Sequence, residues 1–132
     1  MASCVTDTHA LIWYSDARRR KLGRRARQAF ERAETGRAVI YLPTIVVAEL
    51  LEQVRRGHIK LALPPRQWIS ALFALGGFIA ADLSVEVVLA GHELYAIRER
   101  GDRLIAATAK ALSLPLITRD QAIAAAGVDV VW

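Results

Sequence analysis

The sequence predicts a three-layer α/β/α fold, in which a five-stranded parallel sheet lies between two layers of helices. Short apolar runs typical of buried strands alternate along the chain with longer stretches of helical periodicity. Strands that are separated by helices favour parallel pairing, because parallel neighbours need long right-handed crossovers. The chain has 132 residues, of which 54% are hydrophobic, which is ample for one sizeable core. We therefore expect residues 1–132 to form a single domain.

The first half of the chain is expected to begin the alternation with a buried strand, which a short apolar helix follows. In the next helix, Ala26, Phe30 and Ala33 share one face opposite several arginines, and Gly36 ends the helix. Thr44 is expected to be the N-cap of a third helix that ends before Gly57. The expected elements are the strand Ser3–Asp7, the helices Thr8–Ser15 and Gly23–Thr35, the strand Ala38–Leu42 and the helix Thr44–Arg56.

The second half continues the same alternation. Gly101 reads as a break between two helices, and Asp102 is expected to be the N-cap of the second of them. Asp120 is expected to open a short helix before the last strand. The expected elements are the helix Pro65–Gly76, the strand Phe78–Ala81, the helices Ser84–Arg98 and Asp102–Leu112, the strand Pro115–Thr118 and the strand Val128–Val131.

Composition excludes several classes of protein. The single cysteine, Cys4, rules out an internal disulfide framework, and the first residues lack the features of an export signal, so we expect a cytoplasmic protein. The longest uncharged apolar run, residues 68–81, is shorter than the roughly 20 residues that span a bilayer, so no membrane association is expected. Isolated histidines and one cysteine do not make a zinc site, and His58 and His92 are assigned no function.

Positive charge is concentrated near the N-terminus. The net charge is +5, and the excess lies within the first 30 residues. Such a patch attracts a polyanion and neutralises phosphates, so nucleic acid is a natural partner. A solvated surface is the alternative interpretation. The candidate RNA-binding residues are Arg18, Arg19, Arg20, Lys21, Arg24 and Arg25, and Arg27 completes the patch.

Four acidic residues stand at the edges of apolar segments: Asp7, Glu49, Asp102 and Asp120. In open parallel sheets the functional crevice lies at the carboxyl ends of the strands, and Asp7 and Asp120 both follow strands. Carboxylates near one core need a cation, donors or protons to be tolerated. A hard divalent metal ion, Mg²⁺ or Mn²⁺, is the simplest common answer.

Each acid also has a structural interpretation, which the sequence leaves open. Aspartate is a favoured N-cap, and three of the four acids precede or open helices. Glu49 could instead lie on an exposed helical stripe with Glu52 or Gln53.

Four blocks of the sequence resemble those of a PIN-domain ribonuclease, and within this family the VapC toxins of type II toxin–antitoxin systems. The resemblance covers the whole chain and implies a sheet of order 3-2-1-4-5, in which Asp7 and Asp120 are neighbours. One turn departs from the common His-x-Asp-Pro-x-Asp pattern, with Glu99 at its earlier acidic position, and Gly101 is expected to loosen it. The blocks are Val5-Thr-Asp-Thr-His-Ala-Leu-Ile-Trp13, Pro43-Thr-Ile-Val-Val-Ala-Glu-Leu-Leu51, Asp102-Arg-Leu-Ile-Ala-Ala-Thr-Ala109 and Leu116-Ile-Thr-Arg-Asp120.

The resemblance implies an endoribonuclease that uses Mg²⁺ or Mn²⁺ and leaves a 5′-phosphate. Its catalytic residues would be the four acids, which are also the implied metal ligands, and Thr118, whose hydroxyl would hydrogen-bond the cluster. The implied partners are an RNA substrate, a cognate VapB-like antitoxin and a second copy of the chain in a homodimer. The expected apolar contact surface has four candidate residues, which could equally be core: Trp13, Tyr14, Trp68 and Phe73.

Two alternatives of other kinds are a receiver-like phospho-acceptor domain and a PIN-like scaffold that binds RNA without cutting it. Receiver-like domains need a second acid beside the first and a lysine after the last strand, but Thr8 follows Asp7 and the last strand ends at Trp132. The four acids speak against the inactive scaffold.

Overall fold

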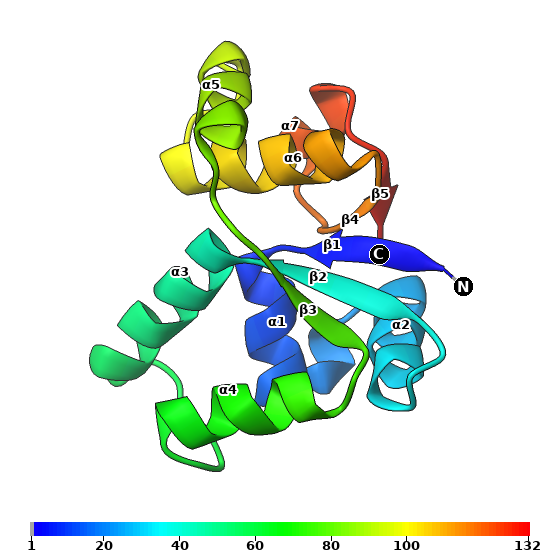
Figure 1. Ribbon diagram of the computed structural model, residues 1–132, viewed down its shortest axis with the longest axis vertical. Helices are drawn as coiled ribbons and strands as arrows, with labels where there is room; N and C mark the ends of the chain where they lie inside the picture. The colour runs from blue at the N-terminus through cyan, green and yellow to red at the C-terminus, as the bar shows by residue number, and fades with distance from the viewer. Residues whose placement is uncertain (1) are drawn as a thin grey trace.

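The computed structural model describes residues 2–132 and contains one parallel five-stranded sheet. The strand order is β3-β2-β1-β4-β5, which confirms the order implied by the resemblance (Figure 1). This order also differs from the 2-1-3-4-5 order of receiver-like domains, so that alternative is wrong. The strands are β1 (Ser3–Thr6), β2 (Val39–Pro43), β3 (Phe78–Ala81), β4 (Leu116–Ile117) and β5 (Val130–Val131).

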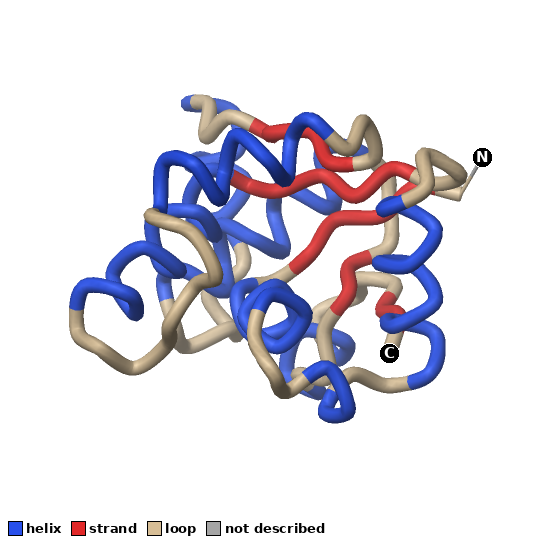
Figure 2. Tube along the Cα trace, turned by 90° about the horizontal axis from the view of Figure 1, so that it is seen from below, coloured by secondary structure: helices blue, strands red, loops and turns tan. Residues whose placement is uncertain are grey.

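Helices cover both faces of the sheet, as the three-layer fold requires (Figures 1 and 2). On one side lie α1 (Thr8–Ser15), α2 (Arg24–Glu34), α3 (Thr44–Arg55) and α4 (Pro65–Ala74). On the other side lie α5 (Val85–Glu93) and α6 (Arg100–Leu112), and the short helix α7 (Gln121–Ala125) connects β4 to β5. A single 3₁₀ turn, η1 (Arg19–Lys21), follows α1. Within residues 2–132, no helix is both long and apolar enough to cross a bilayer.

The core forms around the central strands. Val5, Ile40 and Leu116 are fully buried on three neighbouring strands. Tyr14 stacks on Phe30 with ring centroids 4.5 Å apart, which ties α1 to α2. Because Trp13 and Tyr14 are buried in this core, they are not part of an exposed apolar surface.

Pairing between β1 and β4 determines which side chains meet at the end of the sheet. Thr6 pairs with Ile117, and the amide of Asp7 donates to the carbonyl of Ile117 at 3.1 Å. The chain therefore leaves both strands at the same edge, and Asp7 emerges beside Thr118. This is the crevice position at which open parallel sheets bind ligands.

Two expected helix boundaries are wrong. Helix α5 ends at Glu93 instead of Arg98. Four-residue turns follow it, in which the amide of Leu94 donates to the carbonyl of Gly91 and the amide of Ile97 donates to the carbonyl of Leu94. Helix α6 begins at Arg100, so Asp102 lies in its first turn and is not its N-cap.

The start of α3 also differs from expectation. Pro43 occupies the N-cap position, and the hydroxyl of Thr44 accepts a hydrogen bond from the amide of Leu83 instead of capping the helix.

Candidate active site

Asp7 leaves the end of β1 and caps α1. Its Oδ1 accepts a hydrogen bond from the amide of Ala10 at 2.8 Å. Burial raises the pKa of the Asp7 carboxyl, and the charge of Asp120 raises it further, whereas hydrogen bonds from Thr118 and Ala10 and the charge of His9 lower it. Asp7 is therefore a desolvated carboxylate at the sheet edge that gains from a nearby cation.

Glu49 reaches the same place from the second turn of α3. The hydroxyl of Thr8, in α1, donates to its Oε1 at 2.5 Å. Gly101, in the first turn of α6, lies so close that a Cβ added there would collide with the Glu49 carboxylate. Glu49 is thus enclosed between α1 and α6, and it does not lie on an exposed stripe.

Asp102 lies in the first turn of α6 and is half-buried. Burial is the largest of the effects that raise the pKa of Asp102 to about 6, and the charges of Asp120, Glu49, Asp7 and Glu99 add to it in that order. All of these carboxylates therefore contribute to one electrostatic environment, although they come from four separate parts of the chain.

Asp120 and Thr118 follow β4. Asp120 caps α7 through a hydrogen bond from the amide of Ala122 at 2.9 Å, and its own amide donates to Oγ1 of Thr118 at 3.1 Å. Thr118 is buried, and a hydrogen bond from its side chain lowers the pKa of Asp7. Thr118 consequently links the two aspartates that the strand order brings together.

A cavity of about 490 Å³ is lined by three of the predicted site acids, Asp7, Glu49 and Asp102. Asp120 and Thr118 lie outside its lining. Its acidic lining residues are Asp7, Glu49, Glu52, Glu99 and Asp102, and its basic lining residues are His9, Arg18, Arg56 and His58.

The N-terminal basic patch contributes only Arg18 to this lining. The guanidinium of Arg18 is bound to Asp16 through Nε at 2.8 Å and Nη2 at 2.6 Å. Arg19 pairs with Glu34 at 3.2 Å and lies over the ring of Tyr14. Part of the patch is therefore already paired within the protein.

The acidic residues match the preference of Mg²⁺ and Mn²⁺ for oxygen ligands. Within the described part of the chain, however, no three histidine, cysteine or acidic side chains are grouped closely enough to hold an ion as they stand. Asp7 and Asp120 each use one oxygen in capping, and Glu49 uses one with Thr8. Burial and the charges of neighbouring carboxylates nevertheless raise the pKa values of Asp7 and Asp102, and a bound cation would offset both effects. The residues therefore fit a divalent ion once their side chains turn toward it.

Several residues that line the cavity were not predicted to be site residues, among them Glu99, Arg56 and His58. Glu99 precedes Asp102 by three residues, at the N-cap position of α6, and lies beside the first turn that carries Asp102. Arg56 follows Glu49 by seven residues, which is also a same-face spacing. His58 lies just beyond α3, and no local pattern identifies it.

Comparison with known proteins places the chain in a family. It matches the PIN domain over residues 4–128. No curated protein sequence matches it significantly. Among solved structures, VapBC2 from Rickettsia felis bound to a DNA fragment from its promoter is 20% identical, with a TM-score of 0.68, and the match covers 97% of this chain and 96% of that one.

Two further structures have the same fold. FitAB bound to an IR36 DNA fragment is 25% identical, with a TM-score of 0.66 and coverage of 96% of this chain and 92% of that one. VapC20 from Mycobacterium tuberculosis, a toxin described as cleaving the sarcin–ricin loop, is 16% identical, with a TM-score of 0.59 and coverage of 95% of both chains. Because the family match spans nearly the whole sequence, this chain belongs to the PIN-domain family.

Proposed function

We propose that this protein is a metal-dependent endoribonuclease, the toxin of a type II toxin–antitoxin pair, which hydrolyses RNA phosphodiesters at the acidic cavity. The observation that carries the proposal is that Asp7, Glu49 and Asp102, from three separate parts of the chain, line one cavity. Burial raises the pKa of Asp102, and the charges of Asp120, Glu49 and Asp7 add to that effect. Repelling carboxylates at the carboxyl edge of a parallel sheet are costly unless the site holds a cation. Membership of the PIN-domain family supports the same conclusion.

The proposed metal ligands are Asp7, Glu49, Asp102 and Asp120, with Thr118 as a positioning residue. A bound Mg²⁺ or Mn²⁺ ion would lower the pKa of an attacking water and stabilise the charge that develops on the phosphate. Hydrogen bonds hold two of these side chains, because the amide of Ala10 donates to Asp7 and the hydroxyl of Thr8 donates to Glu49. A carboxylate not engaged with the ion would accept the proton of the attacking water.

The basic patch is proposed to attract the RNA. Arg18 lines the cavity itself. The positive surface extends beyond the cavity through the exposed residues Arg20, Lys21, Arg24 and Arg25. Arg19, which is paired with Glu34, is also part of this surface. Phosphate contacts of this kind hold a strand without reading its sequence.

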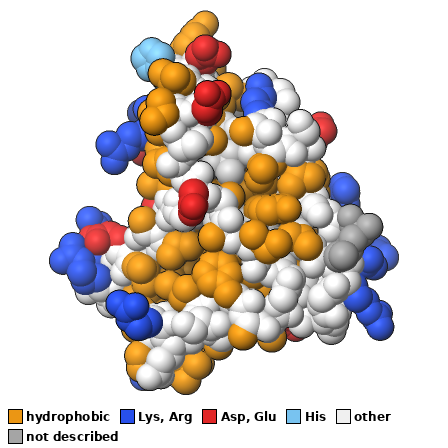
Figure 3. Space-filling model, viewed as in Figure 1, with side chains coloured by type: hydrophobic (Ala, Val, Ile, Leu, Met, Phe, Trp, Pro, Cys, Tyr) orange, Lys and Arg blue, Asp and Glu red, His pale blue; other side chains and the backbone are white. Residues whose placement is uncertain are grey.

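An antitoxin and a second copy of the chain are the proposed protein partners, and the cytoplasm is the proposed site of action. VapBC2 and FitAB are each named as bound to a DNA fragment, and a similar structure from Klebsiella pneumoniae is named as a toxin–antitoxin complex, which supports a VapB-like antitoxin here. Hydrophobic side chains gather on the face that carries β3 and α4 (Figure 3). Leu75, Ile79 and Leu83 are exposed in this region, and Val85 and Leu89 are exposed on α5. Exposed apolar surface of this kind is typical of protein interfaces.

Cleavage of a defined RNA by the purified chain tests the proposed activity. We expect cleavage that requires Mg²⁺ or Mn²⁺, stops on addition of EDTA and is lost in Asp7→Asn, with circular dichroism unchanged. Asp129→Asn is the matched control, because Asp129 lies outside the cavity lining. RNA binding without cleavage by the wild-type chain would instead identify an inactive scaffold.

A further inference from the structure

One face of α3 carries an acidic residue near the middle of the helix and a basic residue at its C-terminal end. Glu49, in the second turn, faces the carboxylates, and Arg56 lies seven residues further along at the C-terminal end, which corresponds to about 10 Å of helix rise. Both side chains line the same cavity, as does His58 just beyond the helix. The cavity therefore extends from an acidic region to a basic region.

Arg55 and Arg56 are adjacent arginines with different geometry. Arg55 uses both Nε and Nη2 on Glu52, at 3.1 and 2.8 Å, so one edge of its guanidinium is occupied. Arg56 reaches Glu52 through Nε alone, at 3.1 Å. Within residues 2–132, the two terminal nitrogens of Arg56 make no hydrogen bond, and Arg56 lines the cavity whereas Arg55 does not.

The surroundings of Arg56 keep this end of the cavity positive. Hydrogen bonds from Arg55 and Arg56 lower the pKa of Glu52, so Glu52 stays ionised and neutralises only one of the two arginines. The Oε1 of Gln53 accepts a hydrogen bond from Nδ1 of His58 at 2.9 Å, so Nε2 of His58 becomes a second donor when the imidazole is protonated. The two terminal guanidinium nitrogens of Arg56 suit one phosphate group, and a protonated His58 would add a donor to it.

We propose that Arg56, with His58 beside it, binds a backbone phosphate of the RNA strand next to the phosphodiester that is cleaved. This inference rests on the proposed function, since it assigns the direction in which the substrate leaves the acidic site. A strand held at this second point has its scissile phosphate positioned near the carboxylates, and the contact carries no base specificity.

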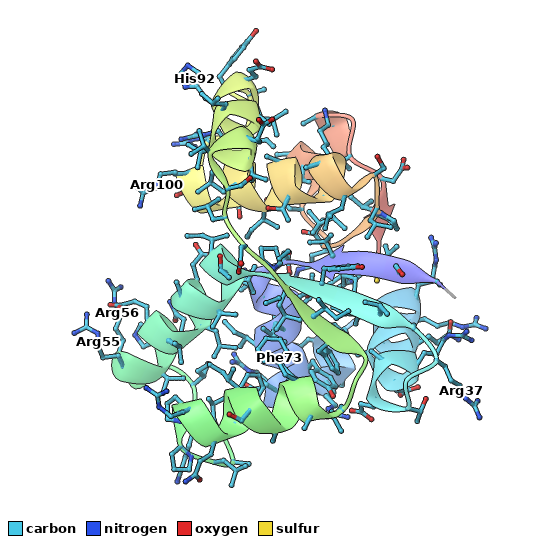
Figure 4. All side chains as sticks on the ribbon, viewed as in Figure 1. Arg37, Arg55, Arg56, Phe73, His92 and Arg100 are labelled. Carbon is cyan, nitrogen blue, oxygen red and sulfur yellow. The ribbon has the colours of Figure 1, made fainter. Side chains whose placement is uncertain are left out.

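Arg55 provides the matched control for Arg56. Arg55→Gln and Arg56→Gln each remove one positive charge and one ion pair with Glu52 at the C-terminal end of α3. Figure 4 shows both side chains together at the end of α3, so general attraction of RNA should be reduced equally in both variants. Only a specific phosphate contact separates the two variants.

The first measurement is RNA affinity in an Asp7→Asn background, in which the strand stays intact. Fluorescence anisotropy across a range of KCl concentrations should show a roughly ten-fold weaker affinity for Arg56→Gln, because a lost charge-assisted contact has about that effect. The slope of log affinity against log salt should fall by about one. Arg55→Gln should change the affinity by less than two-fold. Equal losses in both variants, or no loss in either, would overturn the proposal.

The second measurement locates the phosphate. Each RNA in this series carries one neutral methylphosphonate linkage at a different position. At one position, adjacent to the cleavage site, we expect the neutral linkage to weaken binding by the unsubstituted and Arg55→Gln proteins but not by Arg56→Gln. That pattern is a coupling between one side chain and one phosphate. Equal sensitivity of all three proteins at every linkage would exclude a phosphate bound by Arg56.

His58→Ala and His92→Ala extend the same comparison. His92 lies on the outer part of α5, well away from Arg56 (Figure 4). We expect a several-fold loss of affinity for His58→Ala and none for His92→Ala, and equal effects would remove His58 from the site. Normal metal-dependent cleavage with indistinguishable Arg55 and Arg56 variants would overturn this inference alone, whereas absence of wild-type cleavage would overturn the proposed function.

Discussion

The hydroxyl of Thr8, at the start of α1, donates a hydrogen bond to Oε1 of Glu49, in the middle of α3. The two residues are 41 positions apart in the chain, and the hydrogen bond orients the Glu49 carboxylate. Thr8 follows Asp7 directly, so one turn of backbone at the end of β1 orients two of the proposed metal ligands. Thr8 is therefore a positioning residue for the acidic site.

Thr8→Val keeps the shape of the side chain but removes its donor. We expect the affinity for Mn²⁺ to fall about ten-fold or more, because loss of a hydrogen bond to a metal ligand typically has that effect. Isothermal titration calorimetry measures this affinity directly. Thr8→Ser retains the hydroxyl and should bind Mn²⁺ nearly as well as the original chain. Equal affinities for the Val and Ser variants would show that Thr8 has no positioning role.

Gly101→Ala tests the close approach between α6 and Glu49. A glycine-to-alanine change inside a helix ordinarily stabilises a protein by about 1 kcal/mol. Here the added Cβ would displace the Glu49 carboxylate, so we expect little or no gain in the free energy of unfolding and a weaker affinity for Mn²⁺. In a Glu49→Ala background the ordinary gain of about 1 kcal/mol should return. Urea denaturation of the four proteins measures this coupling, and strictly additive effects would contradict the contact.

The raised pKa of Asp102 predicts a specific pH dependence of stability. Its pKa rises from 3.8 to about 6 in the folded protein, mainly through burial, so the folded state binds this proton more tightly than the unfolded state does. The free energy of unfolding should therefore fall as the pH rises between these two values and stay reduced above them. Without metal, Asp102→Asn should melt at a higher temperature than the original chain at neutral pH, and this difference should disappear at acidic pH.

Adding Mn²⁺ at neutral pH should reverse that order, because only the original chain keeps all of the proposed ligands and an ion bound to the folded state stabilises it. Thermal unfolding followed by circular dichroism provides both comparisons. Identical melting temperatures for the two proteins at every pH would show that Asp102 does not experience the neighbouring charges.

The strands could be predicted from the sequence pattern and the sheet order from the resemblance to PIN-domain ribonucleases, but the environment of Gly101 could not be predicted from either. Buried strands such as β1 carry a local signal, because an apolar run ends at a helix cap. Gly101 reads locally as a break, which led to the wrong assignment of Asp102 as an N-cap. Its actual neighbour is Glu49, 52 positions away in the chain, and only tertiary packing brings them together.

The candidate site shows the same limit. The acidic residues share a type, and three of them lie near the ends of elements, which is why sequence reasoning grouped them. Burial is the main cause of the raised pKa of Asp102, and the charges of Asp120, Glu49 and Asp7 add to it. His58 has no such pattern, since it reaches the cavity only because α3 ends where it does. Asp7 and Asp120 both cap helices, which is the alternative role that the sequence left open. Capping is compatible with the proposed ligand role, because a carboxylate has two oxygens and the cap uses one of them.

Anomalous diffraction from crystals soaked in millimolar Mn²⁺ tests the central claim most directly, namely that carboxylates from distant parts of the chain hold a divalent ion. We expect an anomalous peak inside the cavity, within ligand distance of Asp7 and Asp102, and its loss in crystals of Asp7→Asn. A cavity without a peak at millimolar Mn²⁺, or an ion bound only elsewhere on the protein, would contradict the assignment of the acidic residues.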